Sequence, residues 1–214
     1  LAAKDHVFRA IAEADLVITV GYDVVEYPPN MWNAKRDKKI IHLDFVPAEV
    51  DENYRVEVEV VGDLSHALLM LNHGVSDSPF SIDQTRQHAI RHQMMEDFAT
   101  YEDDDTTGPM RPQKILADVR KALGPSDVLL SDVGAHKMWV ARQYQCYEPN
   151  TCLIPNGFAS MGFALPGLIS AAMVRPDNKV MAIAGDGGFL MNVQEMETAR
   201  RLNSDIVVMV WEDG

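Results

Sequence analysis

The sequence predicts an α/β fold made of two doubly wound parallel-sheet units, both incomplete. Short apolar strands alternate with helix-sized segments in each half of the 214-residue chain, and parallel sheets with crossover helices have this alternation. The composition agrees, because 47% hydrophobic and 24% charged residues are ordinary for a globular α/β protein. A polar stretch between the halves separates the two units.

The first half contains three short apolar strands, expected at 16–20, 40–44 and 56–61. Residues 7–14 have helical spacing ahead of the first strand, which ends at a turn formed by Gly21. A second helix is expected from Asp63, which is placed as its cap, to about Leu71.

The second half shows the same alternation after Pro112. The expected strands are 128–131, 180–184 and 206–211, and the expected helices are 113–123, 136–143, 161–173 and 191–202. Between the halves, residues 77–109 contain the acidic run from Glu102 to Asp105 and are interpreted as a linker with some helix. The two Rossmann-like units therefore occupy 1–76 and 110–214.

Charge and apolar content exclude several classes of function. A net charge of −13 with no basic run disfavours nucleic acid and anionic membranes as partners. The chain has no apolar stretch of about eighteen residues, so we expect neither a membrane-spanning helix nor a signal peptide. Cys146 and Cys152 lack metal-ligand spacing, so we expect reduced thiols in a cytoplasmic protein rather than a disulfide. Leu1 opens without a Met, and the chain stops at Gly214, shortly after the apolar run 206–211, where an α/β protein normally turns into its next helix. A fragment is therefore expected.

Glycines surround a carboxylate at the end of the strand 180–184. Gly185, Asp186, Gly187 and Gly188 follow that strand directly, and the carboxyl ends of parallel strands are where α/β proteins bind ligands. Glycines let the backbone approach a phosphate closely, and the following helix presents free N–H groups to it. The alternative is a tight strand-to-helix connection with no ligand.

A second carboxylate, Asp213, follows the next strand, 213 − 186 = 27 residues after Asp186. Consecutive parallel strands usually lie side by side, so both carboxylates are expected at one rim of the sheet. Such a pair suits Mg²⁺, which completes its octahedron with phosphate oxygens and water. The alternative is that Asp213 is only a turn residue.

This motif and its spacing resemble the thiamine diphosphate motif of the acetolactate synthase family. Most members have Asn at the second position, whereas the catabolic, FAD-independent members have Asp, as at Asp213. The resemblance implies that Asp186 and Asp213 hold Mg²⁺ and that a backbone carbonyl beyond Gly214 is the third protein ligand. Gly185, Gly187 and Gly188 are then cofactor-binding residues.

Residues 156–166 look like the family's segment beside the aminopyrimidine ring of the cofactor. Met161 matches the residue that wedges between the two rings and keeps the cofactor bent, so it is the catalytic candidate. Ala159 matches the residue that offers its backbone carbonyl to the 4′-amino group. By residue type alone, a methionine on an apolar helix is more often part of the core.

Residues 132–139 are similar to the segment that binds the diphosphate through backbone N–H groups and a histidine. The resemblance makes Gly134, Ala135 and His136 cofactor-binding candidates. Gln is common where Ala135 stands, so a side-chain contact from this position is in doubt. A histidine near a helix start is otherwise more often a surface or capping residue.

Residues 21–33 resemble the middle domain of the catabolic enzymes, which places the C-terminal part of that domain at 1–76 and the N-terminal part of the diphosphate-binding domain at 110–214. The biosynthetic members have an arginine-containing segment there that helps to hold FAD, so no FAD is expected. Strand 16–20 is not followed by Gly-x-Gly-x-x-Gly, which argues against a nicotinamide dinucleotide.

The resemblance implies that the whole enzyme is a carboligase that condenses two pyruvates to 2-acetolactate with loss of CO₂. It also implies a homodimer or tetramer, because the activating glutamate belongs to a pyrimidine-binding domain of a neighbouring subunit. That domain is absent from the chain, so the fragment is expected to be inactive alone. Three alternatives stay open: another thiamine diphosphate enzyme (a 2-oxoacid decarboxylase or another carboligase), a nucleotide-binding or regulatory module, and a structural descendant without cofactor.

Overall fold

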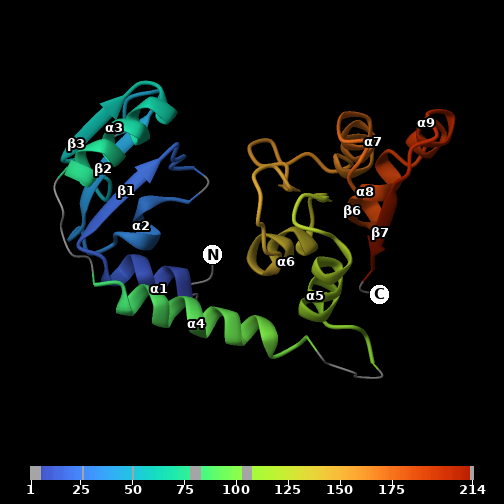
Figure 1. Ribbon diagram of the computed structural model, residues 1–214, viewed down its shortest axis with the longest axis horizontal. Helices are drawn as coiled ribbons and strands as arrows, with labels where there is room; N and C mark the ends of the chain where they lie inside the picture. The colour runs from blue at the N-terminus through green and yellow to red at the C-terminus, as the bar shows by residue number, and fades with distance from the viewer. Residues whose placement is uncertain (1–5, 26, 50, 78–82, 103–107, 213–214) are drawn as a thin grey trace. The chain divides into compact units, whose positions relative to one another are not determined.

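The structure is a computed structural model that describes residues 6–25, 27–49, 51–77, 83–102 and 108–212. The chain divides into two compact units, Leu1–Glu96 and Asp97–Gly214, and each unit contains its own parallel sheet (Figure 1). Every strand pair in both sheets is parallel among the described residues. The predicted class, two parallel-sheet α/β units, is confirmed.

The first unit has a three-stranded sheet in the order β1-β2-β3. Its strands are β1 (Leu16–Val20), β2 (Lys39–Asp44) and β3 (Val58–Val61), and its helices include α1 (His6–Glu13), α2 (Pro29–Trp32) and α3 (Leu64–Asp77). All three predicted strands are present, and the third begins two residues later than expected. Helix α3 extends beyond the expected end at Leu71.

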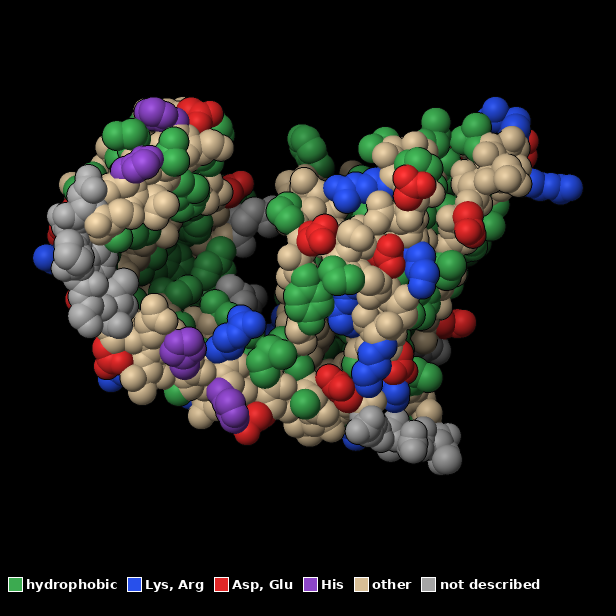
Figure 2. Space-filling view, viewed as in Figure 1, with side chains coloured by type: hydrophobic (Ala, Val, Ile, Leu, Met, Phe, Trp, Pro, Cys, Tyr) green, Lys and Arg blue, Asp and Glu red, His purple; other side chains and the backbone are tan. Residues whose placement is uncertain are grey.

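One face of this sheet carries an aromatic core. Trp32 and Tyr54 are buried with Ile40, and the rings of Trp32 and Tyr54 meet edge to face at 6.2 Å. The Tyr54 hydroxyl also bonds Thr19 Oγ1 at 2.6 Å and His42 Nδ1 at 2.9 Å. The opposite face exposes the alternate β1 residues Leu16, Ile18 and Val20, and green apolar side chains are visible on this unit in Figure 2.

Helix α4 (Thr85–Ala99) lies within the segment interpreted as a linker, and the division between the two units falls in its last turn. The acidic residues 103–105 lie outside the described residues.

The second unit has a four-stranded sheet in the order β5-β4-β6-β7. Its elements are α5 (Pro112–Ala122), β4 (Val128–Ser131), α6 (Ala135–Gln143), β5 (Cys152–Leu153), α7 (Ala164–Val174), β6 (Val180–Gly185), α8 (Asp186–Met191), α9 (Glu195–Arg201) and β7 (Val207–Trp211). The short edge strand β5 is absent from the sequence-based expectation. Both cysteines are free, as expected.

Helices cover both faces of this sheet, as a doubly wound unit requires. Leu129 and Ile183 pack with α5 and α6 in one core cluster. Their neighbours Leu130 and Ala182 point to the other face and pack against α7. Because side chains alternate along a strand, the apolar runs of β4 and β6 supply both cores.

Two helix boundaries differ from the expectation. Helix α7 begins at Ala164 rather than at residue 161, because Gly162 has a φ of 83°, which an α-helix does not accept. The expected helix 191–202 is present as the shorter α9 (Glu195–Arg201), and an additional helix, α8, begins at Asp186 directly after the strand and ends at Met191.

Candidate cofactor site

The carboxyl ends of β4, β6 and β7 lie at one rim of the second sheet. Ser131 pairs in register with Ile183, and Gly185 with Trp211. The residues that follow each strand therefore share this rim, which is where open α/β sheets bind ligands. Two predicted segments, 132–136 and 185–188, come together here.

His136 lies in the first turn of α6 with its side chain turned into the unit. The ring is 6% exposed, and its Nε2 donates to the Asp132 backbone carbonyl at 3.0 Å. It stacks on the Trp211 ring with centroids 6.5 Å apart and planes at 29°. Burial lowers the pKa of His136, and the nearby carbonyl and carboxylate of Asp132 oppose this effect. In the neutral ring, Nδ1 is therefore an acceptor.

Gly134 lets this ring approach the backbone closely. A Cβ atom at Gly134 would lie 2.7 Å from His136 Cε1 and 2.9 Å from Nδ1, and one at Gly185 would lie 3.6 Å from Cε1. Ala135 is exposed at the first position of α6, whose cap residue makes no side-chain hydrogen bond. The Lys137 N–H of the first turn donates to the Gly134 carbonyl at 3.1 Å. The N–H groups of Ala135 and His136, at the first two positions, have no i−4 carbonyl within the helix and suit an anion.

The turn after β6 carries the predicted carboxylate. Asp186 is the first residue of α8 and is exposed at the rim. Gly188 is buried beneath it, and a Cβ atom there would lie 3.0 Å from Asp132 Oδ2. The absence of a side chain at Gly188 therefore allows this turn to sit directly on the end of β4.

Met161 lies in a turn and not on the apolar helix where the sequence places it. Ala159 and Gly162 have φ angles of 49° and 83°, so the chain bends on both sides of Met161 before α7 begins. The Met161 side chain is 45% exposed, and its Cε is 3.6 Å from where a Cβ on Gly187 would lie. An apolar side chain thus stands open to solvent beside the glycine turn.

Asp213 lies outside the described residues. Strand β7 ends at Trp211, opposite Gly185, so the prediction that the two strands are adjacent and parallel is confirmed. Within the described ranges, no group of three or more His, Cys, Asp or Glu side chains could hold a metal ion. Asp186 is the predicted metal ligand that the described part contains.

Two family models match the chain. One, described as "Thiamine pyrophosphate enzyme, C-terminal TPP binding domain", matches residues 132–214, and the other, described as "Thiamine pyrophosphate enzyme, central domain", matches residues 1–71. The chain belongs to the thiamine pyrophosphate enzyme family.

Curated members of this family resemble the chain over most of its length. It is 36% identical to an acetolactate synthase of Bacillus subtilis over 95% of this chain and 36% of that protein. It is 33% identical to a catabolic acetolactate synthase of Raoultella terrigena over 96% of this chain and 37% of that protein. A chloroplastic acetolactate synthase of Nicotiana tabacum is 30% identical over 94% of this chain and 30% of its own length. The chain thus spans about a third of the relatives' length.

The described rim residues fit thiamine pyrophosphate (thiamine diphosphate). Gly134 is exposed and Gly185 is half-buried, directly before α6 and α8, so backbone without side chains is accessible to a diphosphate at the start of both helices. Met161 offers an exposed apolar surface next to this turn for the rings of the cofactor. Asp186 presents an oxygen ligand of the kind that Mg²⁺ takes.

Three residues with no role expected from the sequence also contribute to the rim: Asp132, Asn192 and Trp211. Asp132 bonds the N–H of Gly162, Asn192 bonds its carbonyl, and Trp211 stacks on His136. An Asp directly after the buried strand 128–131 is a signal that could have identified the first. The other two contacts depend on packing alone.

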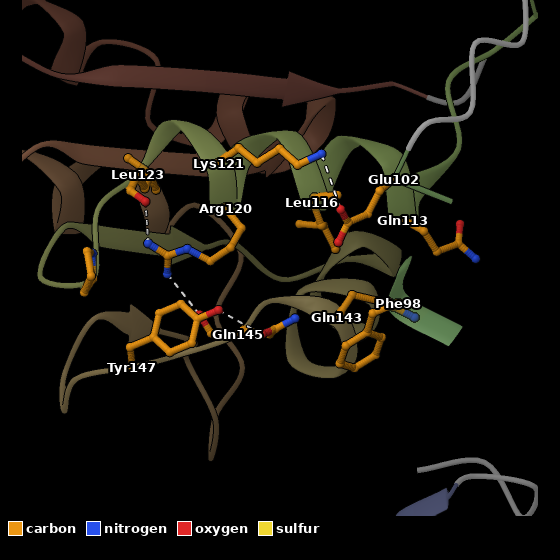
Figure 3. A pocket seen from close by; sticks show the side chains of 12 residues that line it. Phe98, Glu102, Gln113, Leu116, Arg120, Lys121, Leu123, Gln143, Gln145 and Tyr147 are labelled. Carbon is orange, nitrogen blue, oxygen red and sulfur yellow. Dashed lines mark hydrogen bonds and ion pairs between the residues drawn. The ribbon is translucent and has the colours of Figure 1, made fainter. Parts of the chain in front are cut away.

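A separate pocket of about 300 Å³ lies beside α5 and is drawn in Figure 3. Arg120 closes one side by donating to the carbonyls of Gln145 and Leu123, and Lys121 pairs with Glu102 at 3.4 Å. None of the predicted site residues lines this pocket, so it does not belong to the rim site.

On the face that Figure 2 shows, lysine and arginine side chains are scattered among acidic ones and form no continuous basic patch. Among the described residues, none of the helices has both the length and the apolar character needed to cross a bilayer.

Proposed function

We propose that the full-length protein is an acetolactate synthase-type carboligase, which condenses two pyruvates to 2-acetolactate with loss of CO₂. The observation that carries this proposal is the 36% and 33% identity to two acetolactate synthases over nearly the whole chain. The arrangement of the rim residues supports it, because the glycine turns and Met161 suit thiamine diphosphate.

The residues of the chain have distinct parts in this proposal. Gly134, Ala135 and His136, together with Gly185 to Gly188, would hold the diphosphate, mainly through backbone N–H groups. Asp186 and Asp213 would hold Mg²⁺, whose octahedron needs several oxygen ligands. Bound thiamine diphosphate supplies the electron sink for decarboxylation of a 2-oxoacid.

Two groups of the chain would orient the cofactor rings. Met161 would fill the angle between them and keep them bent, and the Ala159 carbonyl would accept a hydrogen bond from the 4′-amino group. The positive φ of Ala159 supports this orientation, because it turns the backbone ahead of Met161.

We expect the whole enzyme to work without FAD. Residues 21–33 lack the arginine-containing flavin segment, and the similarity to a relative named catabolic supports this expectation. We further propose a cytoplasmic homodimer or tetramer without nucleic acid or membrane partners, in which the present chain alone is inactive.

Another thiamine diphosphate enzyme, such as a 2-oxoacid decarboxylase, is the alternative. It would share the rim residues and differ in its products. The names of the relatives favour the synthase, and the exposed Asp186 beside an open Met161 argues against a structural module without cofactor.

The test is an assay of the full-length protein with pyruvate, Mg²⁺ and thiamine diphosphate. We expect 2-acetolactate, detected as acetoin after acid decarboxylation, with one CO₂ released for each two pyruvates consumed. Acetaldehyde as the main product would assign a decarboxylase instead. No conversion and no cofactor binding would reject the proposal.

A further inference from the structure

Gly162, directly after Met161, is held at both of its backbone polar atoms, which belong to two successive peptide groups. Its N–H donates to the Asp132 carboxylate, 3.0 Å from Oδ1 and 3.1 Å from Oδ2. Its carbonyl accepts from Asn192 Nδ2 at 2.8 Å. The two partners come from different elements, since Asp132 follows β4 and Asn192 ends α8.

The Asp132 carboxylate is buried and accepts hydrogen bonds from several backbone N–H groups. It is 1% exposed, and the N–H groups of Val133 and Ala164 also donate to it, at 2.7 and 3.4 Å. Among the described residues it forms no ion pair, and backbone N–H groups surround its charge instead. A buried carboxylate is costly unless such donors surround it, so removing one oxygen acceptor leaves a donor without a partner.

The packing around the Gly162 peptide leaves little freedom. A Cβ atom at Gly162 would lie 2.7 Å from Asn192 Nδ2 and 3.1 Å from Met191 Cβ. On the other side of the Asp132 carboxylate, a Cβ atom at Gly188 would lie 3.0 Å from Oδ2. The backbone of Met161 is thereby tied to the turn that carries Asp186.

We propose that Asp132 and Asn192 are positioning residues that hold the backbone N–H and carbonyl of Gly162. This clamp fixes the position of Met161 relative to the Gly185–Gly188 turn. If the proposed function holds, on which this part rests, the clamp fixes the residue that bends the cofactor relative to the residues that hold its diphosphate. Neither residue touches the cofactor; both act through the backbone next to Met161.

The chain offers a matched control at the other end of β4. Asp127 is also buried, and its carboxylate accepts the N–H groups of Lys179 at 2.9 Å and Gly124 at 2.7 Å. Asp132→Asn and Asp127→Asn therefore make the same chemical change to a buried carboxylate that binds backbone N–H groups. Only the first lies at the rim.

Each variant is made in the full-length protein and studied in two ways. Without cofactor, hydrogen exchange is measured on peptides covering residues 159–168. With cofactor, the thiamine diphosphate Kd and the kcat and KM for pyruvate are measured. For Asp132→Asn we expect exchange of this segment to be on the order of tenfold faster, as loss of a charged hydrogen bond implies. The Kd should rise and kcat should fall, with KM for pyruvate little changed.

Asp127→Asn should lower thermal stability without these effects. A second pair of variants tests the bond from Asn192. Asn192→Ala should also speed hydrogen exchange of residues 159–168, by about fivefold. Asn178→Ala, which removes a bond to the Ser126 carbonyl at 3.2 Å, should leave the segment unchanged.

Equal exchange and equal cofactor affinity in Asp132→Asn and Asp127→Asn would overturn the clamp. A parent protein that binds no thiamine diphosphate would overturn the proposed function instead, and the exchange measurement would still decide whether the clamp orders the turn.

Discussion

Single residues at the rim combine burial with exposure in a way that suits their expected parts. His136 is buried, which lowers its pKa, whereas Asp186 and Met161 on the neighbouring turns remain open to solvent. An exposed carboxylate can bind the metal ion that accompanies a diphosphate, and an exposed apolar side chain beside it can contact the rings of the same cofactor.

Asp186→Ala in the full-length protein should lose cofactor affinity and activity together. Losing one carboxylate weakens Mg²⁺, and the diphosphate then loses its counter-charge. Because Asp186 is exposed, stability without cofactor should change by less than about 1 kcal/mol. Thermal melts with and without Mg²⁺ and thiamine diphosphate measure both effects. Unchanged ligand-induced stabilisation in this variant would show that Asp186 is not a metal ligand.

His136 should make the cofactor-free protein less stable in acid. Burial lowers the pKa of His136, so the unfolded state, with a pKa of about 6.5, binds the proton first. Stability is then fully present above that pH and falls as the pH drops toward the folded pKa. Urea unfolding between about pH 5 and 8 should show this loss in the parent and a weaker one in His136→Gln. If the free energy of unfolding falls equally in both proteins as the pH drops, His136 is not the source of the acid sensitivity.

At the scale of elements, the strand-to-helix connections position the site. The start of α8 directly after β6 brings Gly188 onto the end of β4, and the late start of α7 leaves Met161 in a turn. Glycine is required in such a connection where another group occupies the place of a side chain.

Gly188→Ala should therefore be destabilising by about 1–3 kcal/mol, the range for overpacking a filled site, because its Cβ would press on the Asp132 carboxylate. The control is Gly74→Ala in α3, where a Cβ would meet nothing within 4 Å. That change should stabilise by roughly 0.5–1 kcal/mol, the helix preference for Ala. Denaturant unfolding of both variants tests the pair, and a neutral Gly188→Ala would show that the turn can shift.

At the scale of the whole molecule, each of the two units has its own parallel sheet and its own core. The described residues of the rim site all belong to the second unit. In the first unit, Trp32 and Tyr54 fill one face of the sheet near the segment where flavin-dependent relatives are expected to differ.

The full-length protein should accordingly purify without colour and need no added flavin for activity. An absorption spectrum between about 350 and 500 nm, together with an assay in flavin-free buffer, measures this expectation. A stoichiometric yellow chromophore that the fold requires would contradict the similarity to the catabolic type.

The sequence by itself determined the α/β class, the strands of both sheets except the short edge strand β5, and the order of the rim segments. These follow from local properties: apolar runs of strand length, glycine turns and carboxylates directly after strands. The tertiary structure decided how those segments are held. The Asp132 carboxylate accepts the N–H of Gly162, 30 residues further along the chain. The ring of Trp211, at the end of β7, stacks on His136 although the two residues are far apart in the sequence. Such contacts depend on strand order and packing. A local pattern of residues does not determine either of these.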